Sequence, residues 1–137
     1  MPDIIDHAVQ AGLIATASQS RAVLARLRYK SSDPFAVQAI FPATASLDGA
    51  EVRWTFGREL LAQGMREPAG DGDVRAWPHG PRHTMLEFHA SEGMAVVRFA
   101  SADLRRFLSS TYLVVPRGDE PRLLDVDADL AALLREA

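Results

Sequence analysis

Apolar and polar residues alternate through much of the first half of the chain, which is the pattern of strands that bury one face. Val23 and Leu27 fall on one face of such a strand, while Arg26 and Arg28 fall on the other. The same alternation predicts an antiparallel meander of four strands, at residues 7–15, 21–29, 35–41 and 51–56.

The apolar period then lengthens from strand-like to helix-like. Phe56, Leu60 and Leu61 would share one side of a helix, so a short helix is predicted over residues 57–63. Gly64 stands where it could end that helix in the left-handed conformation. A loop containing a proline and two glycines follows.

A second set of strands is predicted after this loop. Residues 74–77 have strand character, with Pro78 expected to end the strand, and residues 84–90 and 94–100 continue the pattern around a compact glycine turn. Ser101 can cap a second helix, because apolar residues recur after it at helical spacing.

The end of the chain predicts a loop at residues 116–121 and a short terminal helix at 127–136, with Asp127 as its cap. Strand, small residue and helix therefore follow one another twice. We expect an α+β fold of two β-rich antiparallel-sheet halves, each followed by a helix, at approximately residues 7–65 and 73–113 of a single domain spanning 1–137.

Composition limits the function classes. A chain of 137 residues with 47% hydrophobic residues can form one self-sufficient core. Its 15 basic residues are outnumbered by 18 acidic ones, which disfavours nucleic acid as a partner. Cysteine is absent, so disulfides and thiolate metal sites are excluded. No apolar run of about 18 residues occurs, and we expect a cytoplasmic protein without membrane insertion.

Candidate catalytic and metal-binding patterns are weak. The Gly-Asp-Gly-Asp sequence at residues 70–73 suggests calcium or phosphate, but it lacks the further ligands of an EF-hand and the lysine of a P-loop, so a structural turn is favoured. His79 and His83 are four residues apart, a spacing that metal ligands on a helix can have. Gly80 and Pro81 lie between them and prevent the helix that would place both rings on one face. No serine has the context of a hydrolase nucleophile. We expect no enzyme activity, no cofactor and no metal.

Arginine and aromatic residues are interleaved on the predicted strands, as on a sheet that binds single-stranded nucleic acid. The alternative is a solvated sheet face with cross-strand ion pairs. Trp54 and Trp77 are better suited to a core or a subunit interface. The interleaved residues are Arg26, Arg28, Arg53, Arg75 and Arg98 with Tyr29, Trp54, Trp77 and Phe99.

Several sequence blocks resemble one known family, the SsgA-like proteins, which are sporulation and cell-division regulators of actinobacteria. The order and spacing of the blocks are specific, and the resemblance spans most of the chain. The blocks are residues 27–29, 33–37, 52–64 and 70–78, together with the terminal pattern Leu-Asp-x-Asp-x-x-Leu at 124–130.

The resemblance implies a non-catalytic cytoplasmic regulator or adaptor that acts at developmental septa. The best-known family member recruits the tubulin-like division protein FtsZ, and other members are linked to septal peptidoglycan remodelling. The implied fold has two β-rich halves, each with a helix, assembles as a homotrimer and is similar in shape to Whirly and guide-RNA-binding proteins. That shape keeps single-stranded nucleic-acid binding as the alternative function.

Partner-contact candidates follow from the residues rather than from the family. Asp33 is predicted at a turn, Arg58 and Glu59 at the start of a helix, and Arg75 and Trp77 near the end of a strand. These polar or aromatic side chains are therefore expected at the ends of elements, where residues are often exposed and available to a partner. Arg58 could equally form a salt bridge within a trimer. The turn at residues 70–73 is expected to direct Trp77 into the second sheet.

Overall fold

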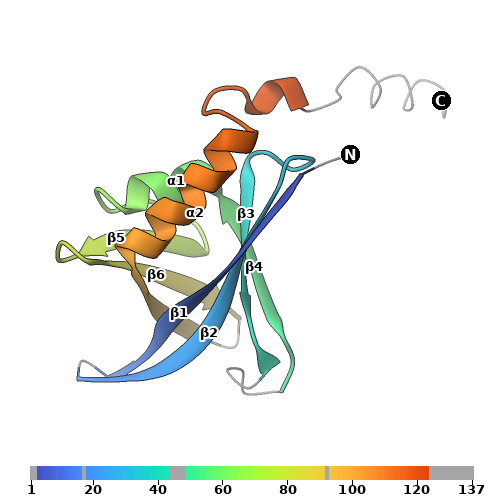
Figure 1. Ribbon diagram of the computed structural model, residues 1–137. Helices are drawn as coiled ribbons and strands as arrows, with labels where there is room; N and C mark the ends of the chain where they lie inside the picture. Colours follow the sequence, from blue (N-terminus) through green and yellow to red (C-terminus); the bar gives the residue numbers. More distant parts are fainter. Residues whose placement is uncertain (1–2, 17, 44–48, 92, 124–137) are drawn as a thin grey trace.

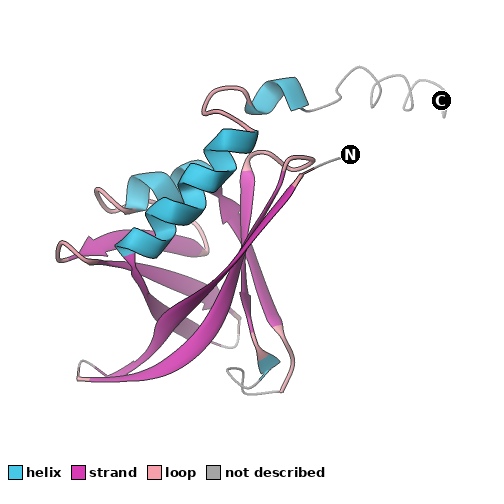
Figure 2. Cartoon of the chain, viewed as in Figure 1, coloured by secondary structure: helices cyan, strands magenta, loops and turns pink. Residues whose placement is uncertain are grey.

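The computed structural model describes residues 3–16, 18–43, 49–91 and 93–123. These residues form a curled, seven-stranded sheet with two α-helices on one side of it (Figures 1 and 2). The elements are β1 (Ile4–Thr16), β2 (Gln19–Lys30), β3 (Ala36–Phe41), β4 (Val52–Gly57), α1 (Arg58–Gly64), β5 (Val74–His79), β6 (His83–Ala90), β7 (Gly93–Ala100), α2 (Ser101–Val114) and the 3-10 helix η2 (Glu120–Leu123).

All seven strands belong to one antiparallel sheet in the order β4-β3-β2-β1-β7-β6-β5. Strand β1 is the link, because it pairs with β2 along its whole length and with β7 around Gly12 and Arg98. The predicted α+β class is confirmed. The predicted division into two sheet halves is not, since the β1–β7 pairing makes the sheet continuous.

The sheet curls until its two ends share one aromatic cluster. Phe88 on β6 lies 5.2 Å from Trp54 of β4 and 5.7 Å from Phe41 of β3, measured between ring centroids. Helix α2 covers the concave side, where Phe107 meets His7 of β1 edge to face. Helices α1 and α2 lie side by side over this core (Figure 1).

The hairpin of β1 and β2 shows the predicted alternation in full. Leu27 and Tyr29 are buried, while Arg26 and Arg28 on the opposite face both bind the carboxylate of Asp6. Burial alone would raise the pKa of Asp6, but the hydrogen bonds from the two arginines outweigh it and hold that pKa below its ordinary value. These strand arginines therefore form cross-strand ion pairs.

Several predicted element ends were wrong. Pro78 does not stop its strand, because β5 is an edge strand and a missing N–H is tolerated there. Ser101 is the first residue of α2 rather than its cap, and its hydroxyl pairs with that of Thr84 at 2.8 Å. Part of the predicted loop 116–121 belongs to η2, and the predicted terminal helix at 127–136 lies outside the described residues.

Gly64 serves a different purpose from the one predicted. It is the last residue of α1, and the chain continues through Met65 with right-handed helical angles, so no left-handed turn ends the helix. A Cβ atom on Gly64 would lie 2.3 Å from the Cβ of Ala76 on β5. Glycine is therefore required because α1 packs directly against the backbone of β5.

Candidate protein-binding surface

Arg58 is buried at the start of α1, with 2% of its surface exposed. Its guanidinium lies between two aromatic rings, 4.9 Å from the centroid of Tyr29 and 4.6 Å from that of Tyr112. Burial raises the pKa of Tyr29, whose hydroxyl donates to the carbonyl of Pro34 at 2.9 Å. The two rings therefore provide a cation–π cage that fixes the arginine between β2 and α2.

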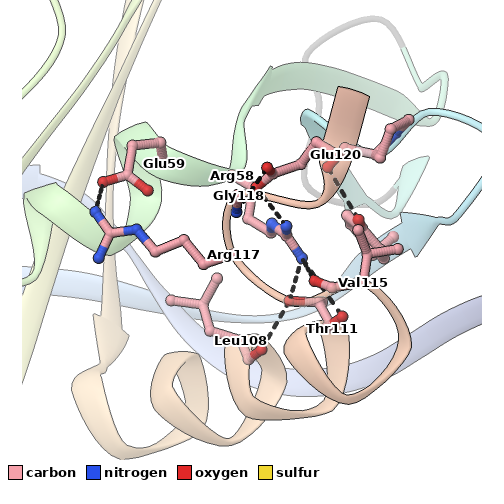
Figure 3. A network of polar contacts seen from close by, with 10 residues as sticks. Arg58, Glu59, Leu108, Thr111, Val115, Arg117, Gly118 and Glu120 are labelled. Carbon is pink, nitrogen blue, oxygen red and sulfur yellow. Dashed lines mark hydrogen bonds and ion pairs between the residues drawn. The ribbon is translucent and has the colours of Figure 1, made fainter. Parts of the chain in front are cut away.

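The same guanidinium ties the end of α2 to α1 (Figure 3). Nη1 donates to the carbonyl oxygen of Val115 at 2.8 Å and, at a longer 3.4 Å, to that of Thr111. Val115 follows the last residue of α2, so its carbonyl has no helical N–H to accept from, whereas the Thr111 carbonyl also accepts the N–H of Val115 at 2.9 Å. Nη2 donates to Glu120 at 2.7 Å, so the segment that follows α2 is held as well.

Glu120 completes this network from η2. Its second carboxylate oxygen accepts the N–H of Gly118 at 2.9 Å, and Gly118 has a φ of 93°, which only glycine adopts readily. Burial acts to raise the pKa of Glu120, but the hydrogen bonds from Arg58 and the backbone outweigh it and keep the pKa below its ordinary value. The carboxylate is therefore charged at neutral pH.

A groove lies between the two helices beside this network, and we name it the α1–α2 groove. Its volume is about 370 Å³. Glu59 on α1 forms an ion pair with Arg117 at one end of it (Figure 3). Its lining includes Arg66, Arg105 and Arg117 around Met65, Leu108 and Tyr112.

A second groove follows the outer edge of β5, and we name it the β5 groove. Its volume is about 600 Å³, and its lining includes Pro68, Gly70, Arg75, Trp77, Pro78 and Glu87. The loop that forms one wall is fixed by a pair of backbone hydrogen bonds between Ala69 and Ala76, at 2.8 and 2.9 Å. Arg75 and Trp77 project to the same side because they are two residues apart on a strand.

The structure brings together two of the five residues proposed from the sequence. Arg75 and Trp77 line the β5 groove, and Glu59 is exposed beside the α1–α2 groove. Asp33 occupies an exposed turn between β2 and β3, apart from both grooves. Arg58 lies beneath the surface, so it shapes the α1–α2 corner and offers no accessible contact in this chain.

Sequence reasoning missed the arginines of the α1–α2 groove. Arg66, Arg105 and Arg117 come from three separate segments, and no local pattern relates them. The available signal was compositional, because arginine supplies nearly all the positive charge of an acidic chain. Only the packing of α2 beside α1 places these side chains around one groove.

The nucleic-acid alternative receives little support from the sheet faces. Tyr29 and Phe99, two of the aromatic residues that would stack on bases, are buried. Arg26 and Arg28 are paired with Asp6, and Trp54 packs on the aromatic core. Of the interleaved arginines and aromatic residues, Arg75 and Trp77 on β5 share one exposed side, whereas Tyr29, Phe99 and Trp54 pack in the core.

Among the described residues, no three His, Asp or Glu side chains are grouped so that they could hold a metal ion. Glu87 and His89 form a pair on β6. None of the helices in the described ranges is long and apolar enough to cross a membrane.

The chain is similar to proteins named for sporulation and cell division. "Sporulation-specific cell division protein SsgB" of Salinispora tropica is 41% identical, with 97% of this chain and 94% of that protein aligned. The protein of the same name from Streptomyces coelicolor is 39% identical, with 91% of each chain aligned.

Solved structures of proteins with similar names have the same fold as this chain. One presented as "Mutations in SsgB correlate to longitudinal cell division during sporulation of Streptomyces coelicolor" superposes with a TM-score of 0.82, at 32% identity over 90% of this chain and 98% of the other. An SsgA-like sporulation-specific cell division protein from Thermobifida fusca YX-ER1 gives 0.81, at 34% identity over 95% of each chain. The family model "Streptomyces sporulation and cell division protein, SsgA" matches residues 23–120. The chain therefore belongs to the SsgA family.

Proposed function

We propose that this protein is a non-catalytic adaptor that regulates sporulation-specific cell division through contacts with other proteins. The observation that carries this proposal is the near-complete alignment with relatives named sporulation-specific cell division protein, at 41% and 39% identity. The proposed location is the cytoplasm, with recruitment to division septa. The α1–α2 groove and the β5 groove are recesses that segments of a partner protein could enter.

The proposed partner is FtsZ or another septum component, including factors that remodel septal peptidoglycan. The β5 groove is the proposed contact, because tryptophan and arginine are the residues that most often dominate binding energy at protein interfaces. Trp77 is half-buried, which means that a partner can cover its exposed part without a large rearrangement. Glu59 and Asp33 are proposed as peripheral contacts, since both are exposed.

Co-sedimentation with FtsZ polymers tests this proposal. The purified chain is expected to pellet with FtsZ, and the double variant Arg75→Ala/Trp77→Ala is expected to bind at least about tenfold more weakly, as for two hot-spot residues. A matched control is Arg53→Ala/Thr55→Ala, which removes two exposed side chains that are likewise two residues apart, on β4 at the opposite edge of the sheet. Wild-type affinity in the Arg75/Trp77 variant would rule out the β5 groove, and absence of wild-type binding would rule out FtsZ.

We further propose that the protein assembles as a homotrimer. Large apolar side chains are exposed on the single chain, among them Leu113 at 87% and Met94 and Ile4 at 59% each, and assembly would cover such groups. Sedimentation velocity is expected to give the mass of three chains at micromolar concentration. A single-chain mass that persists at higher concentration would contradict the trimer.

The likeness to Whirly and guide-RNA-binding proteins remains a prediction, and single-strand binding remains the alternative function. Fold alone does not establish function. Titration of the purified chain with a labelled single-stranded oligonucleotide distinguishes the two. The adaptor proposal expects no tight binding at physiological salt, whereas tight and strongly salt-dependent binding would favour the alternative.

A further inference from the structure

We propose that the α1–α2 groove binds an acidic segment of a partner protein that also carries an apolar side chain. This would be a contact separate from the β5 groove, since the two share no lining residue. The inference rests on the proposed function only in that the partner is a protein. It concerns a different surface and can be tested without any division protein.

The charge of the groove is the first argument. Arg66 follows α1, Arg105 projects from α2 and Arg117 comes from the loop after α2, so three guanidinium groups surround one groove. Among the described residues that line it, none is acidic. The whole chain has a net charge of −3, which makes this a local reversal of the overall charge.

Two of these three arginines are available to bind a ligand. Arg117 is engaged by Glu59, but neither Arg66 nor Arg105 forms a side-chain hydrogen bond or ion pair with any residue in the described part of the chain. Both are exposed. Because a guanidinium presents a planar fork of donors, it matches a carboxylate better than an isolated ammonium does.

The surface between the arginines explains why the segment should carry an apolar side chain. Met65 and Leu108 provide apolar lining, and the Tyr112 ring stands beside them. A volume of about 370 Å³ suits one or two side chains of a peptide rather than a folded domain. The expected ligand therefore alternates carboxylates with a leucine-sized group.

The groove is also preorganised. Arg58 joins α1 to the last turn of α2, and the Glu59–Arg117 pair joins α1 to the loop beyond it. The Tyr112 ring is held on its own helix by the Arg58 cation. A ligand therefore meets walls that are already fixed and loses less binding free energy to ordering the site.

An anionic membrane or a nucleic acid is a poorer match. Both are extended polyanions that select a broad basic surface and a net positive charge. Here the arginines are confined to one small groove on an acidic protein. A short acidic peptide needs only the groove itself.

Fluorescence anisotropy with a synthetic probe tests the proposal on the full chain. The probe is a fluorescein-labelled peptide in which aspartates alternate with leucines. Wild-type protein is expected to bind it, and Arg66→Gln/Arg105→Gln is expected to weaken binding roughly tenfold, equivalent to about 1.4 kcal/mol. The control variant Arg53→Gln/Arg82→Gln removes two exposed arginines elsewhere and matches the change in net charge. It is expected to bind as wild type does.

Further probes separate the sources of binding. A peptide with asparagine in place of every aspartate is expected to lose binding, and phosphatidylglycerol vesicles are expected to bind no better than neutral vesicles. The proposal is overturned if wild-type protein does not bind the acidic peptide, if both double variants weaken it equally, or if the vesicles bind and the peptide does not. The Arg75→Ala/Trp77→Ala variant should still bind the peptide, so failure of FtsZ binding and failure of this inference remain distinguishable.

Discussion

Replacing Arg58 with methionine is expected to lower the free energy of unfolding by about 3–5 kcal/mol, the usual effect of removing one partner from a buried ion pair. Methionine retains much of the side-chain length but has no donor. Glu120 would lose its charged partner, and the carbonyl of Val115 would lose a hydrogen bond of 2.8 Å. The cation–π contacts with Tyr29 and Tyr112 would also disappear.

Urea unfolding followed by circular dichroism measures this effect. Arg53→Met is the matched control, because Arg53 is about half exposed and, among the residues that the structure describes, pairs only with the equally exposed Glu51. Its effect is expected to stay within about 1 kcal/mol. Arg58→Lys should fall between the two, since one ammonium cannot reach the Val115 carbonyl and Glu120 while stacking on both rings. Equal stability of the two methionine variants would contradict the structural role of Arg58.

The free energy of unfolding measured at decreasing pH is a second test of the Arg58–Glu120 pair. The pKa of Glu120 is lowered in the folded protein, so its contribution is fully present above the unfolded-state pKa and is lost as the pH falls through the folded-state value. Arg58→Met removes the main partner responsible. The stability difference between wild type and Arg58→Met is therefore expected to shrink below about pH 4, near the ordinary glutamate pKa. Asp6 contributes to both proteins and should cancel.

The strands and helices could largely be predicted from local patterns, but the connection between them could not. The alternation of Val23 and Leu27 with Arg26 and Arg28 located β2, because side-chain period is a local property. The pairing of β1 with β7 joins residues near Gly12 to residues near Arg98. A repeat of strand and helix suggests two halves and carries no information about such long-range pairing.

At the candidate surface, too, local sequence predicted neighbouring residues but not contacts between distant parts of the chain. Arg75 and Trp77 could be placed together, because residues two apart on a strand face the same side. Arg58 was proposed as a partner contact from its position at a helix start, but Tyr29, Tyr112 and Glu120 converge on it from distant parts of the chain and bury it. Burial of a charged residue depends on partners that local sequence does not identify.

Replacing Gly64 with alanine is expected to destabilise the fold by about 2–3 kcal/mol, as overpacking in a close contact does. The added Cβ would lie 2.3 Å from the Cβ of Ala76 and 3.2 Å from its carbonyl carbon. Neither atom belongs to a flexible side chain. Helix α1 would have to move away from β5, which would also disturb the loop wall of the β5 groove fixed through Ala69.

Thermal and urea unfolding measure the change, with Gly72→Ala as the matched control. A Cβ at Gly72 would meet no atom within 4 Å, so this variant should stay within about 0.5 kcal/mol of wild type. Combining Gly64→Ala with Ala76→Gly removes the shortest contact, although the Ala76 backbone still lies 3.2 Å away. The double variant should therefore be more stable than Gly64→Ala alone, even though Ala76→Gly by itself weakens a strand by roughly 1 kcal/mol. Additive losses would mean that the contact between α1 and β5 does not limit residue size at Gly64.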